Sequence, residues 1–199
     1  MKLPVKNKKG ILIIISAPSG AGKTTVCKYL LKKLPEIVFS VSYTTRSKRP
    51  GEVEGKDYFF VNKEKFLNMV KQKKFIEWAQ VYNNYYGTPK ENIEKNLTKG
   101  KDILLDIDVQ GGKNVRKHYP DGVYIFLLPP SWKALKERLY KRAKDPKEII
   151  NLRLKMAQRE LKYIKYYDYI VVNKELKTTF NIIESIIKAE KNKRIRYEI

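Results

Sequence analysis

The feature that most constrains this chain is the loop SAPSGAGKTT at residues 16–25, which follows the short apolar run ILIII. The apolar run is typical of a buried strand, and apolar residues recur at helical spacing after the loop, up to Pro35. A strand, a glycine-rich loop and a helix in this order are typical of a phosphate-binding loop with the pattern G-x-x-x-x-G-K-[ST]. Ala17 replaces the first glycine, and the other fixed positions of the pattern are present.

The parts of this loop have separate roles in binding a triphosphate. Gly20 and Gly22 let the backbone approach phosphate oxygens, and the N–H groups at the start of the helix point at the anion. Lys23 is expected to reach the β- and γ-phosphates, and the Thr24 hydroxyl is expected to bind Mg²⁺. The alternative, an unrelated glycine-rich turn, does not account for the strand and helix on either side. The predicted nucleotide-binding loop consists of Ala17, Pro18, Ser19, Gly20, Ala21, Gly22, Lys23, Thr24 and Thr25.

Apolar runs and amphipathic segments alternate along the rest of the chain, which predicts an α/β fold with a parallel sheet core flanked by helices. About nine residues at the start and about eight at the end are expected to be loose tails. Further strands are predicted within 102–111, 122–130 and 169–173, and helices at about 110–118, 131–142, 147–166 and 175–191.

Residues 40–95 differ from this pattern and predict a small mixed lobe inserted into the core. Short strands and turns are expected over 37–61, and a short helix over 62–74. The segment 75–89 predicts a strand pair around Asn83 and Asn84, because asparagine tolerates the left-handed backbone of a tight turn.

Composition limits the classes of protein that the chain fits. Its 199 residues suffice for one sizeable core, and no apolar run is long enough to span a membrane. The single cysteine, Cys27, cannot form an internal disulfide, which favours a cytoplasmic location. The net charge of +22 is explained first by a solvated surface of biased composition, and steering of anionic substrates such as nucleotides is an alternative. A nucleic-acid site is a further alternative, although no recognition motif accompanies the basic C-terminal segment.

A second anion site is predicted in the inserted lobe. Arg46 and Arg49 lie three residues apart in SYTTRSKRPGE, and the planar guanidinium group suits phosphate because it gives two hydrogen bonds at once. Tyr58 and Tyr86 are candidates for further phenolic donors. Each arginine taken alone is also explained as a surface charge.

Glu77 lies among apolar residues in FIEWAQ, where a carboxylate needs hydrogen-bond partners. The adjacent N–H and NH₂ groups of guanine would supply two donors in one plane, whereas adenine has no such edge. An exposed glutamate or a structural ion pair is the alternative for this residue.

Two further sets of charged residues are candidates. Asp106 and Asp108 follow a predicted core strand, where acidic groups often meet a metal or its waters; the alternative is that one of them caps the next helix. Arg138 and Arg142 share a helix face because they are four residues apart, and Arg153 lies in the next helical stretch. Solvated helix charges are the alternative for these arginines.

Five segments, in order, resemble the guanylate kinases: SAPSGAGKTT, FSVSYTTRSKRPGEVEGKDYFFV, FIEWAQVYNNYYGT, LLDIDVQGG and AQRELKY…YDYIVVN. The resemblance covers about residues 10–190. It implies a P-loop nucleoside monophosphate kinase fold that transfers a phosphoryl group from ATP to GMP. The implied units are a core (1–39, 96–130 and 164–199), a GMP-binding lobe (40–95) and a lid region (131–163).

The resemblance also implies roles for individual residues. The guanine pocket would be formed by Ser42, Glu77 and Thr88, with Asp106 and Asp108 on the GMP side. The GMP phosphate would be bound by Arg46, Arg49, Tyr58 and Tyr86. The catalytic cations would be Lys23, Arg46, Arg138, Arg142 and Arg153, and Asn173 would lie near the adenine.

A catalytically inactive binding module of the same fold is the main alternative. Such modules typically have a degraded phosphate loop, whereas Lys23 and Thr24 are both present here. Expected partners are ATP with Mg²⁺ and GMP, with no membrane and no specific nucleic acid. The oligomeric state is left open between a monomer and a homodimer.

Overall fold

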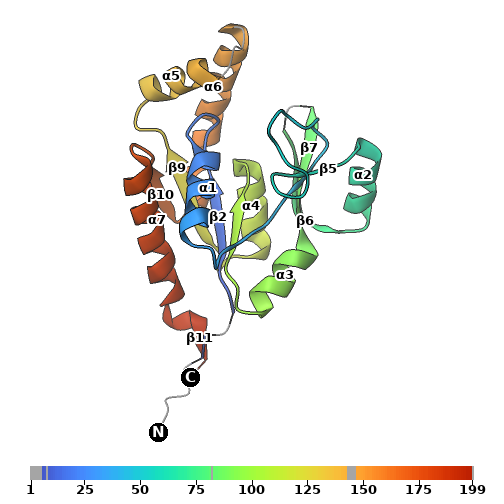
Figure 1. Ribbon diagram of the computed structural model, residues 1–199, viewed down its shortest axis with the longest axis vertical. Coiled ribbons are helices and arrows are strands. Elements are labelled where there is room, and N and C mark those ends of the chain that lie inside the picture. Colours follow the sequence, from blue (N-terminus) through green and yellow to red (C-terminus); the bar gives the residue numbers. More distant parts are fainter. Residues whose placement is uncertain (1–5, 8, 82, 143–146, 199) are drawn as a thin grey trace.

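The structure, a computed structural model, describes residues 6–7, 9–81, 83–142 and 147–198. Its centre is a parallel sheet of five strands in the order β10-β9-β2-β8-β3 (Figure 1). The strands are β2 (Leu12–Ser16), β3 (Val38–Phe39), β8 (Ile103–Asp106), β9 (Val123–Leu128) and β10 (Tyr169–Val172). This confirms the predicted parallel core.

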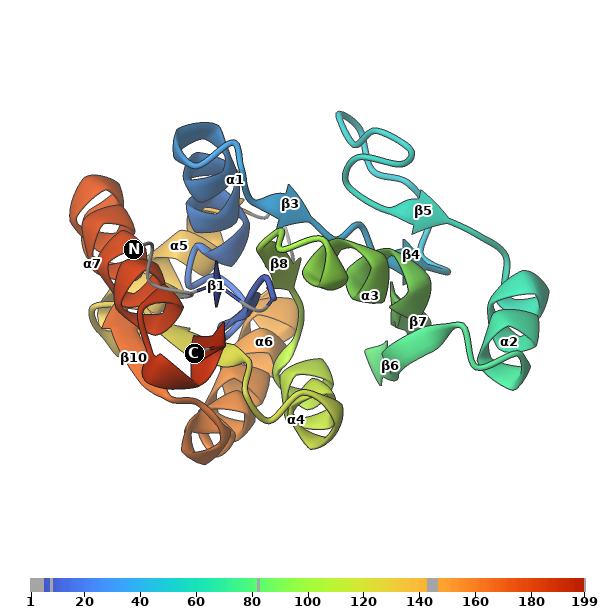
Figure 2. The same ribbon diagram turned by 90° about the horizontal axis from the view of Figure 1, so that it is seen from below.

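Helices cover both faces of this sheet (Figure 2). Alternate residues of a strand point to opposite faces, so Ile13 and Ile15 pack with α1 and α7, whereas Leu12 and Ile14 pack with α3 and α4. The helices are α1 (Lys23–Lys33), α3 (Lys90–Thr98), α4 (Val109–His118) and α7 (Leu176–Lys191). The sheet is therefore buried on both sides, and its loops carry the polar groups.

The inserted segment forms a second, four-stranded sheet in the order β5-β4-β7-β6. Its elements are β4 (Tyr43–Thr44), β5 (Phe59–Phe60), α2 (Lys63–Lys71), β6 (Phe75–Val81) and β7 (Asn84–Pro89). The predicted strand pair over 75–89 is present, but Asn84 is the first residue of β7, where it pairs with Val81, and not part of the turn as predicted.

Helices α5 (Trp132–Arg142) and α6 (Lys147–Leu161) lie beyond the carboxyl ends of the core strands (Figure 1). They pack on each other through the buried side chains of Leu135, Leu139, Ile150 and Ala157. The helix predicted over 147–166 ends at Leu161, and a 3₁₀ turn, η1 (Ile164–Tyr166), follows it.

The division into core, lobe and lid stays a prediction. Its boundary at residue 95 falls inside α3, whose Ile93 and Leu97 both pack against the core sheet.

The expectation of loose tails is wrong for the described ends of the chain. Strand β1 (Lys6–Asn7) pairs antiparallel with β11 (Tyr197–Glu198), after a second 3₁₀ turn, η2 (Arg194–Arg196). Arg196 donates a hydrogen bond of 2.5 Å to the carbonyl of Asp121, just before β9. Sequence patterns did not show this pairing because each strand has only two residues.

Among the helices in the described part of the chain, none has both the length and the apolar character that a membrane crossing requires.

Candidate active site

The phosphate loop connects β2 to α1 at the carboxyl end of the sheet. Gly20 and Gly22 have φ values of 89° and 95°, in the left-handed region that favours glycine. A side chain at position 22 would also place its Cβ 2.5 Å from Asn173 Nδ2. The loop conformation therefore depends on glycine at these positions. Ala17 is buried at the start of the loop, a place that a small side chain can fill.

Lys23 is held at the end of the neighbouring strand β8. Its Nζ lies 2.5 Å from Asp106 Oδ1 and donates a 2.7 Å hydrogen bond to the Ile107 carbonyl. Burial alone would lower the pKa of Lys23, but the Asp106 carboxylate outweighs it and the pKa is raised. Lys23 is therefore a fixed positive charge within the loop.

The helical pair α5–α6 contacts three successive residues of this loop. The Ser19 N–H donates a 3.2 Å hydrogen bond to Glu160 Oε2. Leu135 and Leu139 lie over Gly20, where an added Cβ would be 2.9 Å from Leu139 Cδ2. Arg138 donates to the Ala21 carbonyl at 3.2 Å. Helices α5 and α6 therefore pack against the phosphate loop and stabilise its conformation.

Asn173 and Arg138 meet at the same loop carbonyl. Asn173 Nδ2 donates to the Ala21 carbonyl at 2.8 Å, and Arg138 also donates to the Asn173 carbonyl at 3.0 Å. Asn173 was predicted near the adenine and Arg138 among the catalytic cations, and the structure places both against the phosphate loop.

Glu160 was not among the predicted site residues, although it lies in the quoted segment AQRELKY. Burial raises its pKa to about 7, opposed by the Ser19 N–H and reinforced by Asp108. Its partner in the loop is 141 residues away, so no local pattern could have identified the contact.

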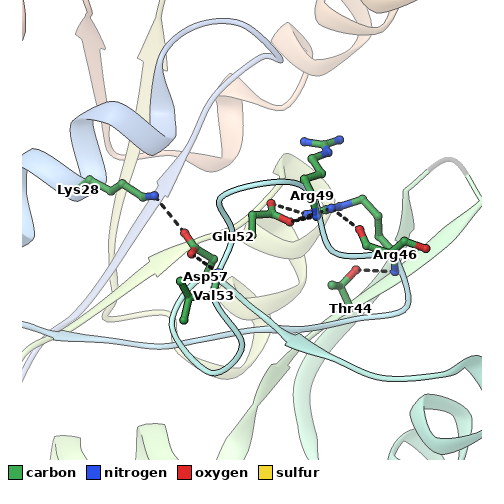
Figure 3. A network of polar contacts seen from close by, with 8 residues as sticks. Lys28, Thr44, Arg46, Arg49, Glu52, Val53 and Asp57 are labelled. Carbon is green, nitrogen blue, oxygen red and sulfur yellow. Dashed lines mark hydrogen bonds and ion pairs between the residues drawn. The ribbon is translucent and has the colours of Figure 1, made fainter.

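On the acceptor side, Arg46 is held by an internal carboxylate (Figure 3). Its guanidinium makes two hydrogen bonds to Glu52, of 2.7 and 3.0 Å, and lies over the Tyr58 ring, 5.5 Å from its centroid. Glu52 also accepts from the Arg49 N–H at 2.8 Å, while the Arg49 side chain points away from it. Tyr86 packs edge-on against Tyr58. Three of the predicted phosphate ligands, Arg46, Tyr58 and Tyr86, therefore lie together, with Glu52 as an unpredicted partner, whereas Arg49 joins them through its backbone N–H.

Glu77 is buried at the inner face of the lobe, with 7% of its surface exposed. Thr88 Oγ1 donates a 2.5 Å hydrogen bond to Glu77 Oε1. Ser42, also buried, directly precedes β4, whose Tyr43 pairs with Gly87, so the register places it next to Thr88. The structure thus brings together the three residues predicted for the guanine pocket and excludes the exposed alternative for Glu77.

Asp108 caps helix α4, because its Oδ1 accepts the Gly111 N–H at 2.8 Å. The capping alternative is therefore confirmed for this residue. Position 111 has no room for a side chain: a Cβ there would lie 2.9 Å from Glu77 Oε2 and 3.0 Å from Asp108 Oδ1. The core and the lobe therefore bring two carboxylates close together at Gly111.

Burial raises the pKa of Glu77 to about 7, although the Thr88 hydroxyl lowers it and Asp108 raises it further. Between pH 4.5 and 7 the Glu77 carboxyl group therefore keeps a proton in the folded chain that it loses in the unfolded chain. The free energy of unfolding therefore falls as the pH rises through this range. The rise from 4.5 to about 7 corresponds to roughly 3 kcal/mol. We expect Glu77→Gln to remove this pH-dependent fall in stability. The measurement is the free energy of urea unfolding of the ligand-free protein at pH 4.5 and at pH 8.

The matched control for this experiment is Glu36→Gln, at an exposed position. It should follow the wild-type pH dependence, and parallel curves for the wild type and Glu77→Gln would contradict the expected result.

Thr24 is the predicted Mg²⁺ ligand, and it lies exposed in the first turn of α1, next to Lys23. The described residues contain no group of three or more His, Cys, Asp or Glu side chains that could hold a metal by themselves. A hydroxyl ligand without a protein cage fits Mg²⁺, which prefers oxygen ligands and keeps waters and substrate phosphates in its shell.

The two remaining predicted arginines lie on the helical pair α5–α6. Arg153 is half-buried on α6, and Arg142 is the last residue of α5, with its side chain outside the described residues. Their roles stay predictions.

The candidate donor and acceptor sites come together near Tyr58, because the preceding residue, Asp57, pairs with Lys28 of α1 at 3.0 Å. Burial raises the pKa of the Tyr58 phenol, with a further rise from Asp106 and an opposing effect of Lys23. Transfer of a phosphoryl group between two nucleotides requires two anion sites in such proximity. The fold and the site therefore define a P-loop nucleoside monophosphate kinase.

Comparisons with known proteins agree with this class. The family model described as guanylate kinase matches residues 9–190. The chain is 50% identical to a guanylate kinase of Clostridioides difficile over 96% of this chain and 93% of the relative. It is 45% identical to one of Carboxydothermus hydrogenoformans, over 96% and 95%. The crystal structure of guanylate kinase from Anaplasma phagocytophilum superposes with a TM-score of 0.82 at 38% identity, covering 96% of this chain and 91% of that chain. The chain therefore belongs to the guanylate kinase family.

Proposed function

We propose that this enzyme transfers the γ-phosphoryl group of ATP to GMP, giving ADP and GDP, at the junction of the phosphate loop and the lobe. The observation that carries the proposal is the buried Glu77–Thr88 pair close to Asp108, which lies two residues beyond Asp106, the partner of Lys23. The N1–H and NH₂ groups of guanine fit a carboxylate acceptor in the ionised form.

In this reaction the nucleophile is a phosphate oxygen of GMP. The second pKa of a phosphate monoester is about 6, so the oxygen is already mostly anionic at neutral pH and needs no general base. The chain has one histidine, His118, which lies in the last turn of α4 and plays no part in the proposal. Catalysis rests on positioning and on neutralising the negative charge of two nucleotides.

The proposed roles of the residues follow from the two anion sites. Lys23 and the loop N–H groups bind the ATP phosphates, with Asn173 near the adenine. On the acceptor side, Arg46 exchanges Glu52 for the GMP phosphate, and Arg49, Tyr58 and Tyr86 complete that site. Arg138, Arg142 and Arg153 would add positive charge from α5 and α6 when these helices approach the triphosphate, an arrangement that would also exclude water.

Mg²⁺ bound with ATP would be held by Thr24, and it would supply further charge neutralisation at the phosphates. We further propose that the enzyme works in the cytoplasm, which suits a chain whose single cysteine is free and buried.

The test is a coupled assay of ADP release with GMP, AMP, CMP and UMP as acceptors. GMP should be phosphorylated far faster than the other three. Equal rates with GMP and AMP would reject the guanine pocket, and no turnover with any acceptor would favour an inactive binding module.

A further inference from the structure

An ion pair connects the phosphate-loop helix to the acceptor lobe (Figure 3). Lys28 Nζ, on α1, lies 3.0 Å from Asp57 Oδ1, in the segment before β5. Lys28 is five positions beyond Lys23 on the same helix, and Asp57 directly precedes Tyr58. The pair therefore connects the helix of the donor site to the residue beside a proposed ligand of the acceptor phosphate.

The Asp57 side of the pair is part of a folded turn. Asp57 Oδ2 accepts the Val53 N–H at 2.9 Å, and the Asp57 N–H donates back to the Val53 carbonyl at 3.0 Å. The Gly55 N–H donates to the Tyr58 carbonyl at 2.9 Å. These bonds fix Asp57 relative to Tyr58, so the position of the Asp57 carboxylate determines the position of the Tyr58 backbone.

The charges favour this contact. The Val53 N–H, and then Lys28, lower the pKa of Asp57, so the carboxylate is ionised at neutral pH. Packing between the lobe and the core is found elsewhere, where β6 contacts α4. The Lys28–Asp57 pair lies away from that contact, at the Tyr58 end of the lobe.

We infer that Lys28 is a positioning residue: by pairing with Asp57 it sets how closely Tyr58 and the acceptor lobe approach the phosphate loop. The inference rests on the proposed GMP site. Lys28 is not one of the proposed nucleotide ligands and acts through Asp57 and Tyr58. Its effect belongs to acceptor binding, because the contacts of the phosphate loop with Asp106, Glu160 and Arg138 do not involve Lys28.

The test compares Lys28→Ala and Asp57→Asn with the wild type. Asparagine keeps an oxygen for the Val53 N–H and loses only the charge. Exposed ion pairs contribute little, so each variant should raise KM for GMP about three- to fivefold while kcat and KM for ATP stay within about twofold. The double variant should have the same KM for GMP as either single variant, because each single substitution already breaks the ion pair. Lys28→Arg, which keeps the positive charge, should have the wild-type KM for GMP.

Lys32→Ala is the matched control, since it removes the same charge from an exposed position on the same helix. It should leave KM for GMP unchanged. High salt should reduce the difference between Lys28→Ala and the wild type, because salt screens exposed charges. Calorimetric titration with GMP alone should show the same ratio of dissociation constants as the KM values.

Three outcomes would overturn the inference: additive effects in the double variant, an equal effect of Lys32→Ala, or a loss confined to kcat. Failure of the wild type to phosphorylate GMP would instead reject the proposed function.

Discussion

Replacing Glu77 with alanine is expected to reduce the preference for GMP over AMP by a factor of about 10³–10⁴. A site that hydrogen-bonds a polar edge rejects a ligand lacking that edge by about 10⁴ or more, because its buried polar groups are then left unpaired. Glu77 is buried, its Oε1 is bonded to Thr88, and its Oε2 lies near Gly111, facing the core. The measurement is kcat/KM for GMP and for AMP, with ATP saturating.

Two controls make this result specific to the base. ATP affinity should be nearly unchanged in Glu77→Ala, because the phosphate loop does not contact this residue in the described structure. Glu91→Ala, at an exposed position of α3, should change neither acceptor. A fall in ATP affinity with intact GMP preference would contradict the assignment of Glu77.

Replacing Lys23 with methionine is expected to lower kcat by about 10²–10³, as the loss of one preorganised charge-stabilising group does in other enzymes. Methionine keeps most of the length of the side chain and removes the charge that would face the β- and γ-phosphates. Rapid-quench measurement of a single turnover would show whether the loss lies in phosphoryl transfer itself.

This substitution also removes the partner of Asp106, so a loss of folding has to be separated from a loss of catalysis. The double variant Lys23→Met/Asp106→Asn removes both charges of the pair and should recover the melting temperature without recovering kcat. Recovery of turnover in the double variant would mean that Lys23 acts only by neutralising Asp106.

Short-range patterns predicted the core well. The run ILIII and the loop after it became β2 and the phosphate loop, because apolar periodicity and glycine placement act within a few residues. For Glu77 the sequence left a partnered acceptor and an exposed or ion-paired carboxylate open, and only the structure shows that the side chain is buried. The proposed ligands Arg46 and Tyr58 were identified by residue type and spacing, and they lie together in the structure.

The unpredicted parts all depend on pairings that leave no local pattern. Glu160 bonds to Ser19 across 141 residues, and Lys28 reaches Asp57 through the folding of the inserted lobe. Glu52 is six residues from Arg46, yet the sequence alone did not show which cation it would meet. Asp108 had two readings from the sequence, and only the position of Gly111 selected the capping one.

The pairing of β1 with β11 brings the two ends of the described chain together beside the amino ends of the core strands. The phosphate loop, Asp106 and Asn173 lie at the opposite, carboxyl ends. A fusion partner attached near either of these paired strands would therefore lie at the end of the sheet opposite the candidate nucleotide sites. The same closeness would let a short linker join the old ends in a circular permutant, with the new ends placed in an exposed surface turn.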